Sequence, residues 1–579
     1  MHKRLWLLAG AAAAVMAIAA SASATTKFAG GSSARVLAAA PFAKAWANVP
    51  RTPAGRKAKS VLVFGMEQDI TGFNLAQADQ TAYWAAVTGE TGVIRGNYIV
   101  DQKGNYHLDM ASSVKVTKTK LTIHIRKNAN WWWGGKKMPV TAADYIYTWK
   151  QFMNPKNNVA STTGYDQIAS ARAIGKKTVV FRWKPGKPFA DYRDLFGYIY
   201  PSKALAGQDF NTFWSDCVCG NNGKPISDGP FYLSNYTKGK GVTLRRNPTF
   251  YGHKAALKEI DFQLITDTNA EIQAMRGGEV DAINPSPQTA LSQLVHQSGV
   301  TYSAIPGFTQ EHWDFQFGSK GNSLIHAPYM RQAIAMGMDR LSLVKALYGT
   351  IAPNLRPLNN TIWEIGTNAK PSFKKWDFNP KKAIATLAKH CTGGPSTPTP
   401  DNQKIWTCGG QKAEFRFDTT AGNQRRATSA AIFSQQLGAI GIKLNVGFHP
   451  ANPNFFGQQL PSNDFDIAEY AWLGGVDPSG FDAIYQCQNT AKNLGGQNYK
   501  LYCNHRVDRL LDAGDKELRP GIRTADYQKA ATIIANDIAI IPLYASPSIL
   551  VYKSAVKGMA ASNNPTQEGP TWNIERWHW

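Results

Sequence analysis

Apolar and polar residues alternate in several short runs in the first third of the chain. Residues 121–126 and 178–184 alternate cleanly, which is the pattern of strands with one buried face. The apolar run at 61–64 ends at Gly65 and predicts a buried strand that leads into a loop. A half-buried sheet is therefore expected in this part of the chain.

A helix is predicted between the two alternating runs. Thr141 is placed to cap a helix that begins at Ala142 and carries Tyr145 and Trp149 at helical spacing. Three consecutive tryptophans at 131–133 precede it. They are interpreted as core or lobe-contact residues, with a platform for a sugar or peptide as the alternative.

The second half of the chain repeats a helix followed by a strand. Residues 424–440 place Phe433, Leu437 and Ile440 on one helical face, Gly441 ends that helix, and Leu444, Val446 and Phe448 then alternate. Residues 525–544 show the same order, with a helical stripe and then the apolar run 540–544. Alternating helices and strands predict α/β lobes with largely buried sheets.

Length and charge limit the class of protein. At 579 residues and 43% hydrophobic, the chain is expected to fold into two or three lobes. The net charge of +24 comes from scattered basic residues without a stripe or a known nucleic-acid module, so we expect no nucleic-acid partner. The charge fits a basic exported protein among anionic envelope polymers; attraction of an acidic ligand is the alternative.

The first residues have the layout of a secretory signal. Lys3 and Arg4 precede the apolar stretch 5–20, and an Ala-x-Ala end predicts cleavage after Ala24. Residues 1–24 are thus predicted to be a signal peptide, with a retained membrane anchor as the alternative, and residues 25–59 a flexible segment. The mature protein is expected to be soluble in the periplasm or outside the cell.

Six cysteines form an even set, which an oxidising compartment would pair. The sequence permits fifteen connectivities, and the predicted pairs are Cys391 with Cys408, Cys487 with Cys503, and Cys217 with Cys219. Each of the first two would contribute roughly 3 kcal/mol in the chain-entropy model. A metal at the Cys-x-Cys motif is the alternative for the third pair, but no histidine lies nearby.

No catalytic motif is visible in the sequence. It lacks a Gly-x-Ser-x-Gly elbow, a His-Glu-x-x-His helix and a phosphate-binding loop, and its eleven histidines are dispersed. No catalytic residue, cofactor or metal is therefore predicted. An exported hydrolase with paired carboxylates stays open as a second class.

An ordered series of segments resembles the peptide/nickel family of extracellular solute-binding proteins. The segments are ISDGPFYLSNYTKGKGVTLRRNPTFYG (226–252), IDFQLITDTNAEIQAMRGGEVD (260–281), MRQAIAMGMDRLSLVKALYGTIAP (330–353), FNPKKAIATLAKH (378–390), FDIAEYAWLGGVDP (465–478), and GGKKMPVTAADYIYTWK near residue 140. The series spans nearly the whole chain after residue 60. The family consists of receptors for transporters that use a binding protein.

The resemblance implies an α/β fold with two hinged lobes, of the periplasmic-binding-protein type II, with an extra subdomain in the first lobe. Lobe I would consist of residues 60–75, 226–302 and 546–579. The extra subdomain would be 76–225, and lobe II 303–545. A solute that contacts both lobes would stabilise the closed form by its additional contacts there.

The resemblance also implies the ligand contacts. Tyr470, Ala471, Trp472 and Leu473 would offer backbone groups to an extended peptide, which pairs as an added strand. Glu67, Gln68 and Asp69 correspond to the family's loop after its first strand. Trp313 is a further candidate for lining the cleft, or else a core residue.

One departure concerns the anchoring acid. Familiar peptide receptors carry an Asp three residues after the tryptophan, where this chain has Gly475. Either Asp477 has taken over that role, or it caps or turns the chain.

The predicted function is a monomeric receptor that delivers peptides or peptide-like solutes to the membrane permease of an ABC transporter. The alternatives within the family are oligosaccharide, haem, opine or metal-chelate receptors. Nickel is disfavoured because no histidine cluster is visible.

Overall fold

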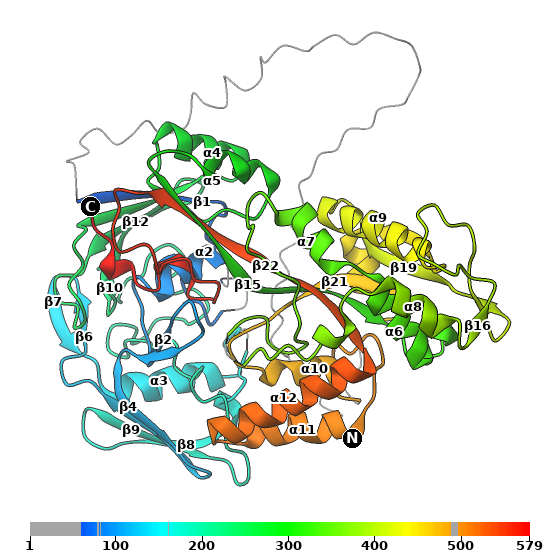
Figure 1. Ribbon diagram of the computed structural model, residues 1–579. Coiled ribbons are helices and arrows are strands. Elements are labelled where there is room, and N and C mark those ends of the chain that lie inside the picture. Colours follow the sequence, from blue (N-terminus) through cyan, green and yellow to red (C-terminus); the bar gives the residue numbers. More distant parts are fainter. Residues whose placement is uncertain (1–59, 78–79, 81–82, 160, 367, 488–495) are drawn as a thin grey trace.

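Two lobes lie on either side of a pair of long antiparallel strands, β15 (Val300–Phe315) and β22 (Ile540–Lys553) (Figure 1). The structure is a computed structural model that describes residues 60–579 except 78–79, 81–82, 160, 367 and 488–495. The predicted signal peptide and flexible segment lie outside the described residues. The α/β prediction with two lobes and crossing segments is confirmed.

The two long strands join both lobes in one ten-stranded sheet. On the lobe I side, the sheet consists of β11 (Phe231–Thr237), β12 (Gly241–Arg246), β13 (Glu259–Leu264), β1 (Val61–Met66) and β14 (Ala282–Ile283). On the lobe II side, it continues through β21 (Ile467–Leu473), β19 (Glu414–Thr420) and β20 (Lys443–His449). The register of β15 against β22 shifts between Pro306 and Gln310. The sheet is interrupted there, a few residues from the predicted lobe boundaries at 302 and 546, which stay predictions.

The segment predicted as an extra subdomain has its own antiparallel sheet, in the order β4 (Ala111–Val116), β5 (Lys120–Ile125), β9 (Thr178–Trp183), β8 (Ile168–Ala173). Helix α3 (Ala142–Met153) begins after Thr141 as predicted, and the Asp144 carboxylate accepts a hydrogen bond from the Thr141 N–H at 2.8 Å. The smaller sheets are formed by β2 (Tyr98–Val100) with β3 (Tyr106–Leu108), and by β10 (Ile226–Ser227), β6 (Asn130–Trp133) and β7 (Lys136–Pro139).

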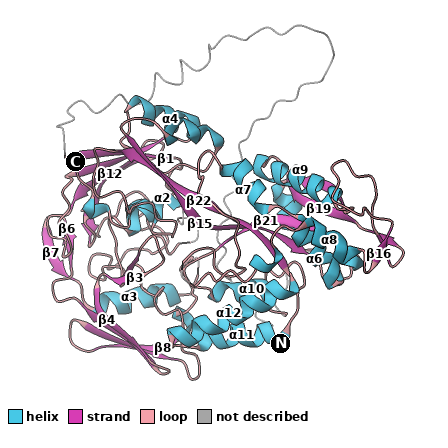
Figure 2. Ribbon diagram, in the orientation of Figure 1, coloured by secondary structure: helices cyan, strands magenta, loops and turns pink. Residues whose placement is uncertain are grey.

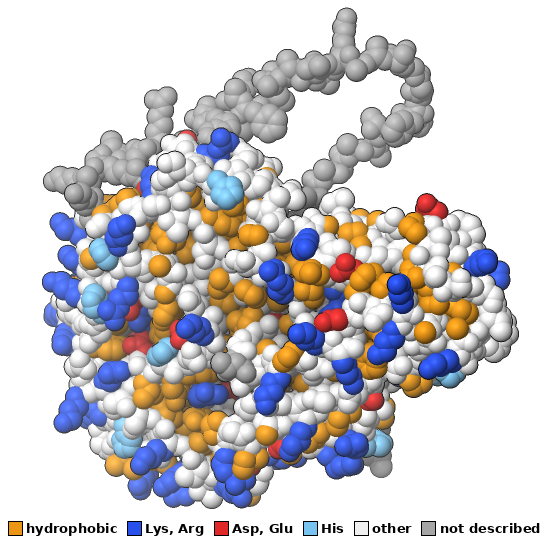
Figure 3. Space-filling view, viewed as in Figure 1, with side chains coloured by type: hydrophobic (Ala, Val, Ile, Leu, Met, Phe, Trp, Pro, Cys, Tyr) orange, Lys and Arg blue, Asp and Glu red, His pale blue; other side chains and the backbone are white. Residues whose placement is uncertain are grey.

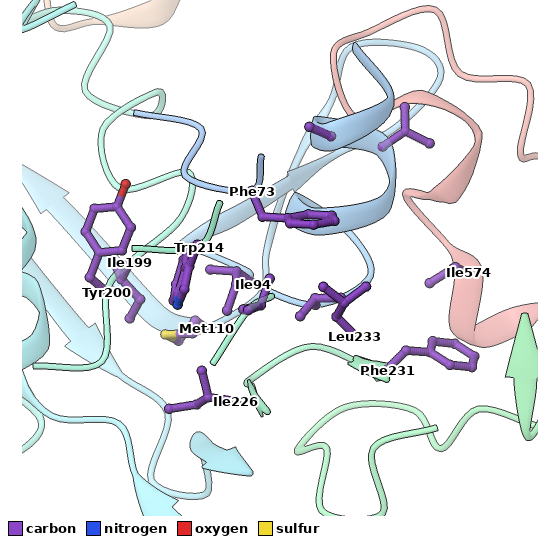
Figure 4. Packing of buried hydrophobic residues seen from close by; sticks show 14 of the residues in the cluster. Phe73, Ile94, Met110, Ile199, Tyr200, Trp214, Ile226, Phe231, Leu233 and Ile574 are labelled. Carbon is purple, nitrogen blue, oxygen red and sulfur yellow. The ribbon is translucent and has the colours of Figure 1, made fainter. Parts of the chain in front are cut away.

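The extra segment shares one hydrophobic core with lobe I. Figure 4 shows part of this cluster, which contains Phe73, Tyr200, Trp214, Leu233 and Ile574 from distant parts of the chain. Of the tryptophan run, Trp131 is fully buried and Trp132 stacks on Tyr232 at 4.1 Å between ring centroids. The shared core implies that lobe I and the extra segment move as one body.

Helices cover both faces of the lobe II sheet (Figure 2). On one face lie α6 (Pro328–Gly337), α7 (Arg340–Tyr348), α8 (Pro380–Leu387) and α9 (Gln424–Ala439); on the other lie α10 (Asp482–Tyr485), α11 (His505–Lys516) and α12 (Pro520–Asp537). Of the three alternating residues predicted for β20, Leu444 is buried, but Val446 and Phe448 are 39% and 47% exposed. The predicted apolar face is thus only partly buried, because β20 is the last strand of the sheet.

The three predicted disulfides are present: Cys217–Cys219, Cys391–Cys408 and Cys487–Cys503. The second joins β16 (Cys391–Thr392) to β17 (Thr407–Cys408), beside β18 (Gln411–Lys412). The remaining α-helices of the described residues are α2 (Tyr83–Ala85), α4 (Thr268–Gly277) and α5 (Ser292–Val295). In the part of the chain that the structure describes, none of the helices has the length and apolar character that a membrane span requires.

Candidate functional site

Strand β21 has a partly open edge. It pairs along its whole length with β15, from Ile467 opposite Phe315 to Leu473 opposite Thr309. On its other side, β19 pairs only with Ile467 and Ala468. Within the described residues, no strand pairs with 470–473 on that side. This stretch therefore has an edge that an extended chain can join.

The direction of the backbone groups follows from the antiparallel ladder. The Gly474 N–H donates to the Phe308 carbonyl oxygen at 2.8 Å, so every second residue before it, Trp472 and Tyr470, also bonds toward β15. The N–H and C=O groups of Ala471 and Leu473 therefore point to the open edge. Two residues of the predicted four present their backbone there, and the other two hold the strand in the sheet.

The side chains of Tyr470 and Trp472 support the strand from inside lobe II. Trp472 is 9% exposed and stacks between the rings of His312 and Tyr499, at 5.8 and 6.0 Å. Its indole N–H has no hydrogen-bond partner among the described residues. Tyr470 is fully buried and donates its hydroxyl to Asp314 at 2.5 Å. Both rings thus fix the position of the backbone that the open edge presents.

A buried charged pair lies beneath these rings. The Lys500 ammonium and the Asp314 carboxylate are 3.4 Å apart and neither side chain has exposed surface. His312 lies beside the pair, 3.7 Å from Asp314, and burial lowers the pKa of His312 to about 4 although Asp314 opposes that shift. His312 is therefore a neutral packing residue at physiological pH.

Asp477 is held by an arginine of α12. Both oxygens of its carboxylate accept hydrogen bonds from the Arg523 guanidinium, and one also accepts the Ser479 N–H at 3.0 Å. Burial opposes ionisation of Asp477, but the hydrogen bonds and charge of Arg523 outweigh it and hold its pKa below the ordinary value. This geometry favours the second predicted role of Asp477, which is to turn the chain after β21.

The predicted lobe I residues bind other parts of lobe I. The Glu67 carboxylate accepts hydrogen bonds from Thr268 at 2.6 Å and from the backbone and side chain of Ser286. Asp69 accepts the Gly239 N–H at 2.8 Å, at the turn between β11 and β12. Gln68 lies half-buried between them. This loop is ordered within lobe I, and its contact with a ligand stays a prediction.

Trp313 lies on the face of the lobe II sheet that α6 to α9 cover. It has no exposed surface, donates its indole N–H to Glu469 at 2.8 Å, and packs edge-on against Phe433 of α9. The structure therefore places it in the core of lobe II, which was the other interpretation of its sequence position.

The two lobes meet at a small cavity of about 60 Å³ beside the end of β21. Its lining from the extra segment is Ala190, Tyr192 and Arg193; its lining from lobe II includes Trp363, Val476, Asp477, Pro478, Arg523 and Tyr527. A larger concavity of about 860 Å³ lies over α4 and α5 on lobe I. We take the smaller cavity as part of the candidate site because both lobes contribute to it and its lining includes Val476, three residues after the end of β21.

A buried acid beside this strand end was missed by sequence reasoning. Glu364 is 6% exposed, and neither carboxylate oxygen has a partner from any other described residue. Burial raises the pKa of Glu364 to about 8. A side-chain carbon added at Gly474 would lie 2.2 Å from one of its oxygens, so the carboxylate lies against the backbone just after β21.

One group of metal-ligand side chains lies close together in the described part of the chain: Cys487, Cys503 and His505. The two sulfur atoms are joined in a disulfide, so they are not thiolate ligands. The arrangement carries no metal assignment.

The family model described as bacterial extracellular solute-binding proteins, family 5 middle, matches residues 105–493, which is more than half of the chain. The chain belongs to this family. As a family 5 protein, it shares its fold and its place among solute-binding proteins with the relatives that follow.

The relatives match most of the family 5 protein. The oligopeptide-binding protein OppA of Bacillus subtilis is 24% identical over 498 residues, covering 81% of this chain and 85% of OppA. The solved structure of a periplasmic EDTA-binding protein, EppA, superposes with a TM-score of 0.72 at 20% identity, covering 91% of this chain and 98% of EppA. The Bacillus subtilis oligopeptide-binding protein AppA, in complex with a nonapeptide, gives a TM-score of 0.62 at 21% identity, covering 89% and 98%.

Proposed function

We propose that the protein is the exported receptor of an ABC importer that captures peptides between its two lobes and delivers them to a membrane permease. It acts as a monomer, transforms nothing chemically and binds no nucleic acid. Family membership and the peptide-binding relatives support the receptor role. Figure 3 shows Lys and Arg side chains spread over one face of the molecule, which fits an exported basic protein better than a nucleic-acid groove.

One observation carries the peptide assignment: the open edge of β21, where no described strand pairs with the backbone groups that Ala471 and Leu473 direct away from β15. An extended peptide pairs with such an edge through its own backbone, so its side chains can vary. The cavity between the extra segment and lobe II is lined from Val476 onward, three residues after β21, so a peptide that extends past the end of the strand contacts both lobes. Those additional contacts shift the population toward the closed form that the permease recognises.

Backbone pairing is tested with tetra-alanine and four derivatives, each N-methylated at a different residue. Because a paired strand uses alternate N–H groups, methylation at alternate positions should weaken binding at least tenfold in isothermal titration calorimetry, and the other positions should tolerate it. Tetrapeptides with varied side chains serve as the matched control and should bind with similar affinity. Equal affinity for all methylated peptides, or no affinity for any peptide, contradicts the proposal.

A receptor for a non-peptide solute is the second candidate, because one solved structure of the same fold is that of a periplasmic EDTA-binding protein, EppA. The two candidates differ in what co-purifies with the protein. Peptide fragments in the denatured extract support the first candidate, and a chelate, sugar or other non-peptide solute supports the second.

A further inference from the structure

The segment that carries Glu364 is held firmly against the sheet. The Asn360 carboxamide oxygen accepts the N–H groups of Ile362 and Trp363 at 2.8 and 2.9 Å, which turns the chain just before Glu364. The Tyr485 hydroxyl of α10 donates to the Thr361 carbonyl oxygen at 2.8 Å. The carboxylate is therefore positioned by its backbone and does not depend on a flexible loop.

The carboxylate lies against Gly474, the residue directly after β21. Gly474 has no side chain, and any added carbon would meet the Glu364 carboxylate at 2.2 to 2.4 Å. Gly475, which follows, also leaves the backbone uncovered. The glycine pair that ends the strand is thus the feature that admits an acid from a different segment, more than 100 residues earlier in the chain.

No positive group of the described chain pairs with Glu364. Tyr485, whose phenol lies within electrostatic reach, is the titratable side chain found beside it. The nearby Arg523 is already bound to Asp477. A buried carboxylate without a partner destabilises a protein, so such groups concentrate at functional sites.

Other polar atoms around the strand end also have no partner. They are the indole N–H groups of Trp363 and Trp472 and the carboxamide oxygen of Gln310, which lies opposite Trp472 in the ladder. The Gln310 side-chain N–H donates a hydrogen bond to the Asn360 carbonyl oxygen at 3.4 Å, which fixes the direction of the Gln310 carboxamide oxygen. Two donors and an acceptor thus remain without partners on residues that flank the end of β21 and Glu364.

We propose that Glu364 is a cation subsite that receives an ammonium group of the solute at the end of β21. The proposal rests on the proposed function, because it needs a solute along the open edge. The carboxylate that binds the ammonium group would then come from a segment outside β21, and Asp477 would stay paired with Arg523. An ammonium ion beside Glu364 supplies the missing partner and favours the ionised carboxylate.

The test compares tetra-alanine with N-acetyl-tetra-alanine by isothermal titration calorimetry at pH 7 in two buffers of different ionisation enthalpy. The parent should bind the free-amino peptide at least tenfold more tightly and release protons as it binds. In Glu364→Gln, which keeps the shape of the side chain, that preference and the proton release should disappear while the acetylated peptide binds as before. The control is Asp228→Asn, a buried acid with a raised pKa that packs beside Arg95; it should keep the preference.

The outcomes separate this proposal from the proposed function. Equal affinity of the parent for both peptides, or a full preference in Glu364→Gln, overturns the subsite and leaves the receptor assignment intact. Failure of the parent to bind either peptide overturns the peptide receptor and the subsite together.

Discussion

The ion pair between Asp477 and Arg523 fixes the turn after β21, and Asp477→Asn removes its charge at nearly constant shape. The two side chains are 4% and 9% exposed, and one of their hydrogen bonds measures 2.6 Å. The variant leaves a guanidinium that is still bonded to the Gly514 carbonyl oxygen and lies over the Tyr527 ring, but has lost the charge of the carboxylate that pairs with it.

Breaking a buried pair by removing one partner costs about 3 to 5 kcal/mol. For a unit of about 150–250 residues, each kcal/mol lowers the unfolding midpoint by about 2 to 4 °C, so the midpoint should fall by roughly 6 to 20 °C. Because the pKa of Asp477 is lowered in the folded state, its stabilisation is present above the ordinary carboxyl pKa and is lost as pH falls through the lowered value. The deficit of the variant should therefore shrink in acid.

Thermal unfolding followed by circular dichroism at pH 7 and pH 3 measures both effects. The control is Asp464→Asn, whose partner Arg416 and own side chain are 44% and 53% exposed, so that the loss should be below about 1 kcal/mol. The reasoning is refuted if Asp477→Asn unfolds at the same temperature as the control. A normal midpoint with a lost preference for free-amino peptides would instead make Asp477 the ligand's anchor.

Three further outcomes are expected. In Trp472→Phe, the fluorescence change on binding tetra-alanine should shrink markedly, because Trp472 lies in β21, the strand that we propose pairs with the peptide; an unchanged spectrum contradicts that proposal. Ligand-free Glu364→Gln should be more stable than the parent at pH 9 but not at pH 4. Burial raises the pKa of the Glu364 carboxyl from 4.5 to about 8, so it destabilises only the ionised form, by at most about 5 kcal/mol. A stability difference that does not depend on pH refutes this prediction. Replacing Cys391 and Cys408 by Ser should lower stability by about 3 kcal/mol but preserve peptide affinity, since the pair joins β16 to β17; a lost affinity would place these strands in the site.

Local patterns predicted most of the individual elements. The alternating runs became β5 and β9, Thr141 precedes α3, and the stripe through Phe433 and Leu437 faces the core from α9. These features depend on residues close in sequence, where side-chain period and capping chemistry decide the structure. The two-lobed arrangement was predicted from the ordered series of segments that resemble the family, because no local pattern indicates it.

The site was only partly predictable because its geometry depends on distant pairings. The sequence indicated the strand 470–473, but which of its residues face the open edge follows from the register with β15. Asp477 and its partner Arg523 are 46 residues apart, and Glu364 meets Gly474 only in the folded chain. Trp313 and Trp472 look alike as strand tryptophans, and only the packing of the sheet shows that they face opposite helical layers.

Native mass spectrometry of the protein mixed with a tetrapeptide library, followed by denaturation, tests the receptor assignment most directly. If the protein is a receptor, one peptide should bind per chain and should be released on denaturation with an unchanged mass. Released fragments of the peptides, or a protein that acquires no added mass from the library, would contradict it.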